Sequence, residues 1–133
     1  MPAGYSGTPL AKKLSLKSGL SVHFHAMPGS VRDEIGDAGV IEIDAIRPGL
    51  DAAHIFTTDR AEMDRLLAGL RHAINPAGFV WVSWPKKASK VPTDITEDTI
   101  REICLPMGWV DVKVCAVDQV WSGLKLMIRK ELR

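Results

Sequence analysis

The sequence lacks the features that mark several specialised classes of protein. It has only two cysteines, Cys104 and Cys115, in 133 residues, which is too few for a disulfide framework and predicts two reduced thiols. No apolar run approaches the ~18 residues that a membrane span requires. Residues 1–4 do not begin the apolar core of a secretory signal peptide. These absences predict a cytoplasmic protein that does not contact a membrane.

The sequence also lacks an excess of charge of one sign. Its 17 lysines and arginines nearly balance 16 aspartates and glutamates, which gives a formal net charge of +1. Without an overall field that would attract a polyanion, we predict no nucleic-acid partner, and electrostatic binding would have to come from local clustering of charges. Hydrophobic residues make up 46% of the chain, which is enough to fill the core of one domain.

Hydrophobic periodicity predicts strands that alternate with helices. Strands are predicted over residues 20–26, 40–45, 52–57, 79–84, 110–117 and 120–130. Helices are predicted over residues 10–16, 31–35, 59–74 and 94–105. Thr8 is placed to cap the first helix. Asp59 and Glu62 have the spacing of a capping box at the start of the third helix, and Asp94 and Glu97 have it at the start of the fourth.

The order of these elements predicts a three-layer α/β fold. Strands that alternate with helices form a mostly parallel sheet with right-handed crossovers. Only Asp118 and Gln119 join the last two strands, so those strands must be antiparallel. We therefore predict one Rossmann-like domain over residues 20–133, preceded by an N-terminal arm over residues 1–19 that carries a short helix. A strand order of 2-1-3-4-6-5 would place the topological switch point between the first and third strands.

The layout of residues 51–130 resembles that of class I S-adenosylmethionine-dependent methyltransferases. A strand that begins at Asp51 leads into a long helix, the helix ends at residues 75–78, and a further strand, helix and antiparallel strand pair follow. The Gly-rich loop of those enzymes has no counterpart, because residues 25–30 contain one glycine. The resemblance therefore implies a shortened methyltransferase-like fold and implies neither cofactor binding nor methyl transfer. Glu42 and Asp44 would either bind ribose hydroxyls or lie on a solvated strand.

Five segments are similar to an uncharacterised bacterial family of the domain-of-unknown-function type. They are residues 5–14, 81–87, 93–97, 110–117 and 121–126. They are spread along the chain from residue 5 to residue 126, and the resemblance brings no known activity with it.

The candidate ligand site lies where the parallel strands end, since open α/β sheets bind ligands at the carboxyl ends of their strands. Lys86 and Lys87 follow a buried strand beside Trp84, and two cations there can hold a phosphate or a carboxylate. The loop over residues 85–95 is long for a compact domain, as binding loops often are. The alternative is a solvated basic loop with Trp84 as a core residue. The predicted ligand-binding residues are Ser30, Thr57, Thr58, Trp84, Lys86, Lys87 and Ser89.

Other polar groups carry weaker hypotheses. Gly29 and Ser30 begin a helix and would either present free N–H groups to an anion or simply cap the helix. His23 and His25 lie on one face of a strand, where they would share a metal if a third ligand joined them. The alternative is a polar strand face covered by a helix or the arm, and no metal site is predicted. Residues 5–8 of the arm would either cover the ligand site or dock on the body of the same or a second chain.

The C-terminal hairpin holds a further set of candidates. Cys115 would need a nearby base to act as a nucleophile, and its apolar neighbours favour a small core residue instead. Lys113 and Lys125 alternate with apolar residues on the two strands and face either each other or solvent. An inner polar cluster would comprise Lys113, Asp118, Ser122 and Lys125.

Two functions of different kinds remain open. The first is binding of a small anionic ligand at the strand ends, with no catalytic residue or cofactor assigned. The alternative is a non-catalytic protein-interaction module that uses an exposed tryptophan or the hairpin edge. Its partner would be another protein or a second copy of the chain in a homodimer. A true methyltransferase is disfavoured because the Gly-rich loop is missing.

Overall fold

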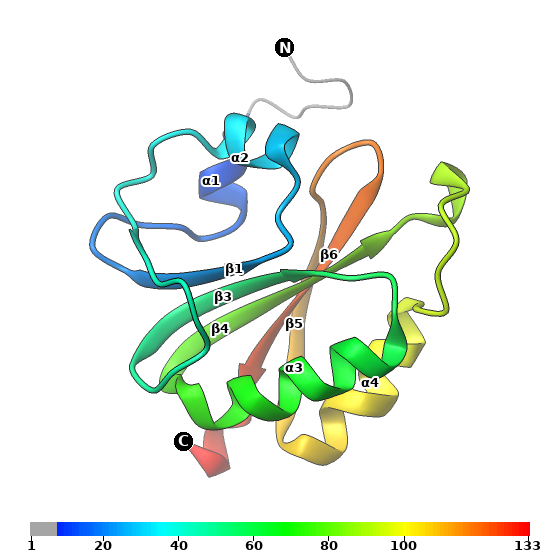
Figure 1. Cartoon of the computed structure of the whole chain (residues 1–133). Coiled ribbons are helices and arrows are strands. Elements are labelled where there is room, and N and C mark those ends of the chain that lie inside the picture. The colour runs from blue at the N-terminus through cyan, green and yellow to red at the C-terminus, as the bar shows by residue number, and fades with distance from the viewer. Residues whose placement is uncertain (1–7) are drawn as a thin grey trace.

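The computed structural model describes residues 8–133, which form a six-stranded sheet flanked by helices (Figure 1). The strand order is β2-β1-β3-β4-β6-β5, the order for which the switch point would lie between the first and third strands. The first four strands pair in parallel, and β6 is antiparallel to both β4 and β5. The strands are β1 (Ser21–His25), β2 (Ile41–Glu42), β3 (Leu50–Phe56), β4 (Ile74–Pro85), β5 (Trp109–Ala116) and β6 (Trp121–Ile128).

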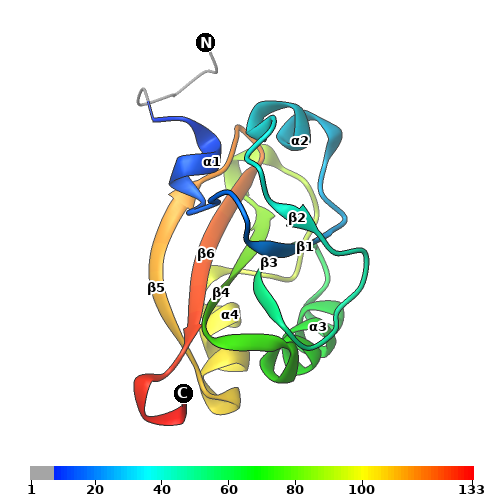
Figure 2. The same ribbon diagram turned by 90° about the vertical axis from the view of Figure 1, so that its left-hand side faces the viewer.

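Four α-helices cover the sheet in two layers. Helices α3 and α4 pack on one face, and α1 and α2 pack on the other (Figures 1 and 2). The α-helices are α1 (Leu10–Lys13), α2 (Gly29–Ile35), α3 (Arg60–Ala73) and α4 (Glu97–Cys104). Short 3₁₀ turns are η1 (Lys87–Ser89), η2 (Leu105–Met107) and η3 (Lys130–Leu132). The fold is therefore the predicted three-layer α/β arrangement, and no helix of the described part is long and apolar enough to cross a membrane.

Each face of the sheet has its own apolar core. The periodic apolar face of α3 is buried, as its i, i+3, i+4 spacing predicts, against β4 and β6. On the opposite face, Leu14 at the end of α1 is fully buried and packs with Trp81 and Phe56. The indole Nε1 of Trp81 donates a 2.9 Å hydrogen bond to the Leu14 carbonyl. This bond satisfies a buried donor and fixes α1 to the sheet.

The turn predicted over residues 75–78 is part of β4. Helix α3 ends at Ala73 and β4 begins at Ile74, so no loop separates them. The register between β3 and β4 then shifts, because Leu50 pairs with Ile74 and Ala52 pairs with Phe79. The extra residues form a bulge that absorbs the Asn-Pro-Ala-Gly segment. A Cβ on Gly78 would lie 2.5 Å from the Asp51 carbonyl oxygen, so the bulge requires glycine there.

Asp59 is confirmed as the N-cap of α3, but Glu62 does not complete the predicted capping box because it bonds Thr57; the predicted caps of α1 and α4 are wrong. Asp59 caps α3, because its carboxylate accepts from the Ala61 N–H at 3.0 Å. Thr96 caps α4 by accepting from the Thr99 N–H, and the predicted cap Asp94 instead accepts from the first N–H of α3. Helix α1 has no side-chain cap; Pro9, and not Thr8, occupies its N-cap position.

Several elements are shorter than predicted, including α4, which is Glu97–Cys104 in place of residues 94–105, and β6, which is Trp121–Ile128 in place of residues 120–130. Helix α1 stops at Lys13 and does not reach residue 16, because Ser15 adopts a left-handed conformation with φ of 60°. Strand β2 comprises only Ile41–Glu42 in place of residues 40–45. It lies at the sheet edge with both residues exposed, so little burial holds a longer strand in place.

Candidate functional site

The switch point lies between the neighbouring strands β1 and β3. Both strands run in the same direction, and the chain leaves β1 for α2 on one face and leaves β3 for α3 on the other (Figure 1). In open α/β sheets this divergence is where ligands bind. We call the carboxyl ends of β1, β3 and β4 with their following loops the rim.

A polar network joins β3, α3 and β1 at the switch point. Thr57 is 3% exposed, and its hydroxyl oxygen accepts from the Asp59 N–H at 3.1 Å. The same hydroxyl donates to Oε1 of Glu62 at 2.6 Å. The second carboxylate oxygen of Glu62 lies 3.7 Å from Nε2 of His25, and both side chains are about one-third exposed or less, at 33% and 28%. Solvent therefore reaches an imidazole–carboxylate pair at the end of β1.

Sequence reasoning missed this pairing. It treated Glu62 as half of a capping box and His25 as a possible metal ligand. Glu62 is in the first turn of α3, so its side chain points back toward the strand ends, where Thr57 offers a hydroxyl proton. The order of β1 beside β3 then brings His25 into range. The signal was available in the predicted strand order combined with the position of Glu62 in the helix.

The backbone of the rim is strained at two positions. Among residues 8–133, three residues other than glycine have positive φ: Ser15, Ala26 and Lys90. Ala26, with φ of 53°, makes the turn after β1 where the methyltransferase-like layout has glycine. Lys90, with φ of 61°, lies in the loop after β4. Each costs about 1–2 kcal/mol, and such strain tends to concentrate at functional sites.

The two rim lysines lie beyond the end of β3. Ser83 pairs with Phe56, the last residue of β3, so β4 continues past its neighbour and carries Lys86 outward. Lys86 is half-buried and Lys87 is exposed. Neither lysine forms an ion pair with a carboxylate within residues 8–133.

Two further predicted site residues have structural roles beside these lysines. Trp84 is 8% exposed and packs in the core beneath α3 and α4, so its ring supports the strand end from inside. Ser89 donates to the Lys86 carbonyl at 2.7 Å and stabilises the η1 turn.

The loop after β4 is tied back to the end of β3. Thr93 donates to the Thr58 carbonyl at 2.8 Å, and the Asp94 carboxylate accepts from the Arg60 N–H at 2.8 Å. These bonds hold the loop that carries the rim lysines against the end of β3, where Thr58 is exposed. Ser30, exposed at the second position of α2, forms no hydrogen bond to any of them among those found within residues 8–133.

The histidine and acidic candidates have mostly structural partners. Nδ1 of His23 lies 2.8 Å from the Ile43 carbonyl oxygen, and His25 pairs with Glu62. Within residues 8–133 no three metal-ligating side chains gather. Glu42 accepts two hydrogen bonds from Arg32, at 2.8 and 3.0 Å, and these bonds lower the pKa of the Glu42 carboxyl. Glu42 is thus already occupied, while Asp44 is exposed.

The hairpin does not form the predicted polar cluster. Lys113 and Lys125 pair directly across β5 and β6. The carboxylate of Asp118 accepts from the N–H groups of Val120 and Trp121, at 2.8 and 2.7 Å, and so shapes the turn. Cys115 is half-buried, and burial raises the pKa of its thiol, which disfavours a nucleophilic thiolate.

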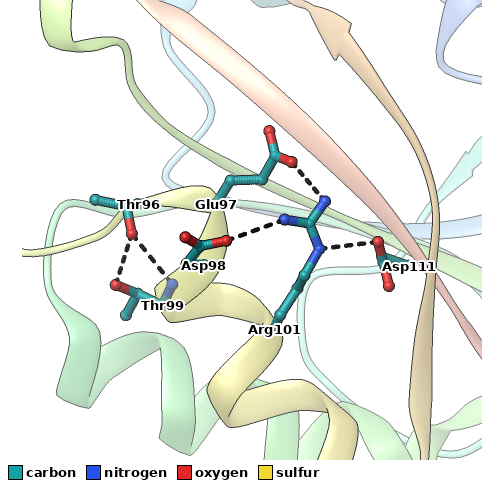
Figure 3. A network of polar contacts seen from close by, with 6 residues as sticks. All are labelled: Thr96, Glu97, Asp98, Thr99, Arg101 and Asp111. Carbon is teal, nitrogen blue, oxygen red and sulfur yellow. Dashed lines mark hydrogen bonds and ion pairs between the residues drawn. The ribbon is translucent and has the colours of Figure 1, made fainter.

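A second polar network lies on α4, away from the rim (Figure 3). The guanidinium of Arg101 pairs with Glu97, with Asp98 at 3.3 Å and with Asp111 of β5 at 3.0 Å. The hydrogen bonds to Asp111 and Glu97 raise the pKa of Arg101 above its ordinary value. A shallow hollow of about 510 Å³ lies over this region, lined by Asp98, Arg101, Glu102, Leu105 and Pro106. Its cation is already neutralised by three carboxylates, so the network joins α4 to β5 and has little capacity left for an anion.

Comparisons with known proteins place the fold among methyltransferases. No model of a known protein family matches the chain, and no curated protein matches it. Among solved structures, a putative type 11 methyltransferase from Sulfolobus solfataricus superposes with a TM-score of 0.66 at 12% identity, over 91% of this chain and 90% of the other.

Two further structures give the same result. A SAM-dependent methyltransferase from Aquifex aeolicus has a TM-score of 0.61 at 17% identity and covers 90% of this chain and 89% of its own. Fibrillarin from Aeropyrum pernix, solved with natively bound S-adenosyl-L-methionine, has a TM-score of 0.59 at 11% identity, over 93% of this chain and 70% of the other. At these identities the likeness establishes a methyltransferase-like Rossmann fold and nothing further.

Proposed function

We propose that the protein binds a small anionic ligand at the rim. Lys86 and Lys87 supply the positive charge, and Ser30, Thr57, Thr58, Trp84 and Ser89 form the surroundings. The observation that carries this proposal is the pair of lysines without carboxylate partners, on a loop that is hydrogen-bonded to the end of β3.

The contacts described above give these residues different roles in ligand binding. The lysine ammonium groups are point charges suited to a phosphate or carboxylate. Thr58 and Ser30 are exposed and have side-chain hydroxyls within the same rim. Thr57 and Trp84 are buried, so they act by positioning Glu62 and by supporting the end of β4.

The fold neighbours suggest one ligand class to test first. The Aeropyrum fibrillarin structure holds S-adenosyl-L-methionine, which carries a carboxylate. The turn after β1 in this chain uses Ala26 in a left-handed conformation in place of a Gly-rich loop. We infer that S-adenosylmethionine, if it binds, binds more weakly than to a protein whose backbone approaches it through glycines.

A thermal-shift panel tests the proposal. The panel comprises S-adenosylmethionine, S-adenosylhomocysteine, nucleotides, coenzyme A and inorganic phosphate. A ligand at about 100 times its dissociation constant adds about 2.7 kcal/mol of stability, which raises the melting temperature by several degrees in a domain of this size. The Lys86→Ala and Lys87→Ala double variant should lose the shift, whereas Lys130→Ala, which removes one exposed charge in η3, should keep it. A panel without any shift, or a shift that survives in the double variant, contradicts the proposal.

A non-catalytic interaction module is the second candidate function. The observation that favours it is the edge strand β5, where Val112 and Val114 are each 49% exposed. Exposed apolar residues on an unpaired edge suit a partner chain or a second copy of this one. Sedimentation should then show a dimer that Val114→Asp dissociates. We also propose that the protein is cytoplasmic and that it belongs to the bacterial family to which its five segments are similar.

A further inference from the structure

The arginines and lysines of this protein are used differently. Among residues 8–133, four arginines form ion pairs with carboxylates: Arg32, Arg60, Arg101 and Arg129. No lysine in that part of the chain does so. Like Arg47, Arg65, Arg71 and Arg133, these lysines have no carboxylate partner within residues 8–133, and a place where several of them gather would attract an external anion.

Four of these lysines gather where α1 meets the hairpin, on the face opposite α4. Lys13 donates to the Ala116 carbonyl at 3.2 Å, and Lys125 donates to the Ser15 hydroxyl at 3.0 Å. Lys113 lies directly across from Lys125. Lys17 completes the group, which we call the lysine face: Lys13, Lys17, Lys113 and Lys125.

The lysine face is costly to the fold. Like charges directly opposite each other on neighbouring strands destabilise a sheet, and Lys113 and Lys125 occupy such a pair. Burial, Lys113 and Lys17 together lower the pKa of Lys125. The hairpin's own carboxylates are committed elsewhere, with Asp111 on Arg101 and Asp118 on the turn. The hydrogen bonds of Lys13 and Lys125 join α1 to the hairpin, but no carboxylate within residues 8–133 forms an ion pair with any of the four lysines.

Apolar surface lies beside the lysines. The ammonium of Lys125 lies 4.6 Å from the centre of the Phe79 ring, and Met127 pairs with Phe79 across β4 and β6. Both Phe79 and Met127 are half-buried. Helix α1 lies at one end of β5 and β6, and in the part of the chain that the structure describes these strands continue beyond it with no helix over that face (Figure 2).

We propose that the lysine face binds a single-stranded nucleic acid, with phosphates on the lysines and unpaired bases against Phe79 and Met127. Lysine is a point charge that suits phosphate oxygens, whereas planar carboxylates are matched best by the fork of arginine. The absence of arginine from the lysine face thus favours a phosphate backbone over an acidic peptide. Single strands expose base faces that stack on flat side chains, and a duplex hides them.

The lysine face is separate from the rim. The overall net charge does not reveal it. The net charge of +1 predicted no nucleic-acid partner, yet the charge is unevenly distributed. Arg32 of α2 and Arg101 of α4 are paired with carboxylates, whereas four lysines without carboxylate partners gather where α1 meets the hairpin. The lysine face includes neither Lys86 nor Lys87, so its test does not depend on the small-ligand proposal.

Fluorescence anisotropy with a labelled oligothymidylate of about 12 nucleotides tests this site. Each phosphate contact with a single strand contributes about 0.7 to the slope of log Kd against log salt. The double variant with Lys17→Gln and Lys113→Gln should reduce that slope by about 1.4 and weaken binding roughly 50-fold near 50 mM salt. The matched control with Lys90→Gln and Lys130→Gln removes the same charge elsewhere and should bind as the unmodified protein does.

The stability of Lys113→Gln gives a second readout of opposite sign. Removing the cross-strand repulsion should raise the melting temperature by about 1–4 °C while binding weakens, so loss of binding cannot be ascribed to unfolding. The proposal is overturned if the oligonucleotide does not bind at low salt, or if both double variants lose affinity equally. Tighter binding of a duplex, or equal competition by polyglutamate of matched charge, also overturns it, in favour of a duplex or an acidic-peptide site respectively.

Discussion

On one face of the sheet, α3 with 14 residues and α4 with eight bury an almost wholly apolar surface, and each helix is capped at its N-terminus by a side chain. On the other face, α1 has four residues and α2 has seven, neither has a side-chain cap, and polar groups are built into the layer. There His54 bonds Ser83, Trp81 bonds the Leu14 carbonyl, and Lys125 reaches Ser15. The first face supplies most of the burial that stabilises the fold, and the second retains side chains that can meet a partner.

Truncating one buried leucine on each face should give the largest contrast. Leu67 of α3 and Leu14 of α1 are both fully buried. Leu67→Ala should cost about 2–5 kcal/mol of global stability, as large-to-small core changes do. Leu14→Ala should cost less, because a four-residue helix can detach while the sheet stays folded. Urea unfolding measures both, with hydrogen exchange as the probe of α1, and an equal loss at the two sites would make the faces energetically equivalent.

The protein should lose folding stability in acid because of His54, which lies on the α1 side of the sheet. This histidine is buried beside Phe56 and Trp81, and burial lowers its pKa to about 3 from the ordinary value of 6.5. Between those values the unfolded chain binds more protons than the folded one, so the stability present above pH 6.5 is lost as the pH falls. From pH 7 to pH 4 the loss should be about 3 kcal/mol. His54→Gln, which retains a partner for Ser83, should remove this component of the pH dependence, and an unchanged profile would rule out His54 as its source.

The two faces should differ least in the reactivity of their cysteine thiols. Cys104 is buried on the α4 side, where burial chiefly raises its thiol pKa to about 11. Cys115, half-buried on the α1 side, also has a raised pKa, offset in part by Lys13 and Lys113. Because thiolates are the reactive form, Cys115 should react first with a disulfide reagent at pH 8, and Cys104 should react mainly on unfolding. Each rate is assigned with Cys104→Ala or Cys115→Ala, and faster reaction of Cys104 would reverse the expected order.

How far the sequence predicts this molecule depends on whether a feature is local or distant in the chain. The alternation of strands and helices and the antiparallel pairing of the last two strands followed from hydrophobic periodicity and from a short connection at Asp118, which are local signals. The role of Asp94 could not be read locally, because its spacing to Glu97 fits a capping box while its actual partner, the Arg60 N–H, is 34 residues away. Strand β2 was overpredicted because its alternation is real but its edge position leaves both residues exposed.

The candidate site also has features that local sequence predicts and features that it does not. The rim was predicted from the general behaviour of open α/β sheets, and Lys86 and Lys87 were found because they follow a strongly apolar strand. The burial of Trp84 and the Thr57–Glu62–His25 network depend on how three elements pack, which the spacing of residues along the chain does not encode. The lysine face was missed because its members come from α1, the segment after it and both strands of the hairpin.

The direct passage from α3 into β4 has a consequence for how the chain could be re-engineered. With no loop between Ala73 and Ile74, and with Gly78 held against Asp51, an insertion or new chain terminus at this joint would shift the helix against the sheet. The connection over residues 117–120 between β5 and β6 and the loop after β4 lie outside the sheet core and are better points for cutting or grafting. A circularly permuted chain opened at the joint should therefore be the least able to refold.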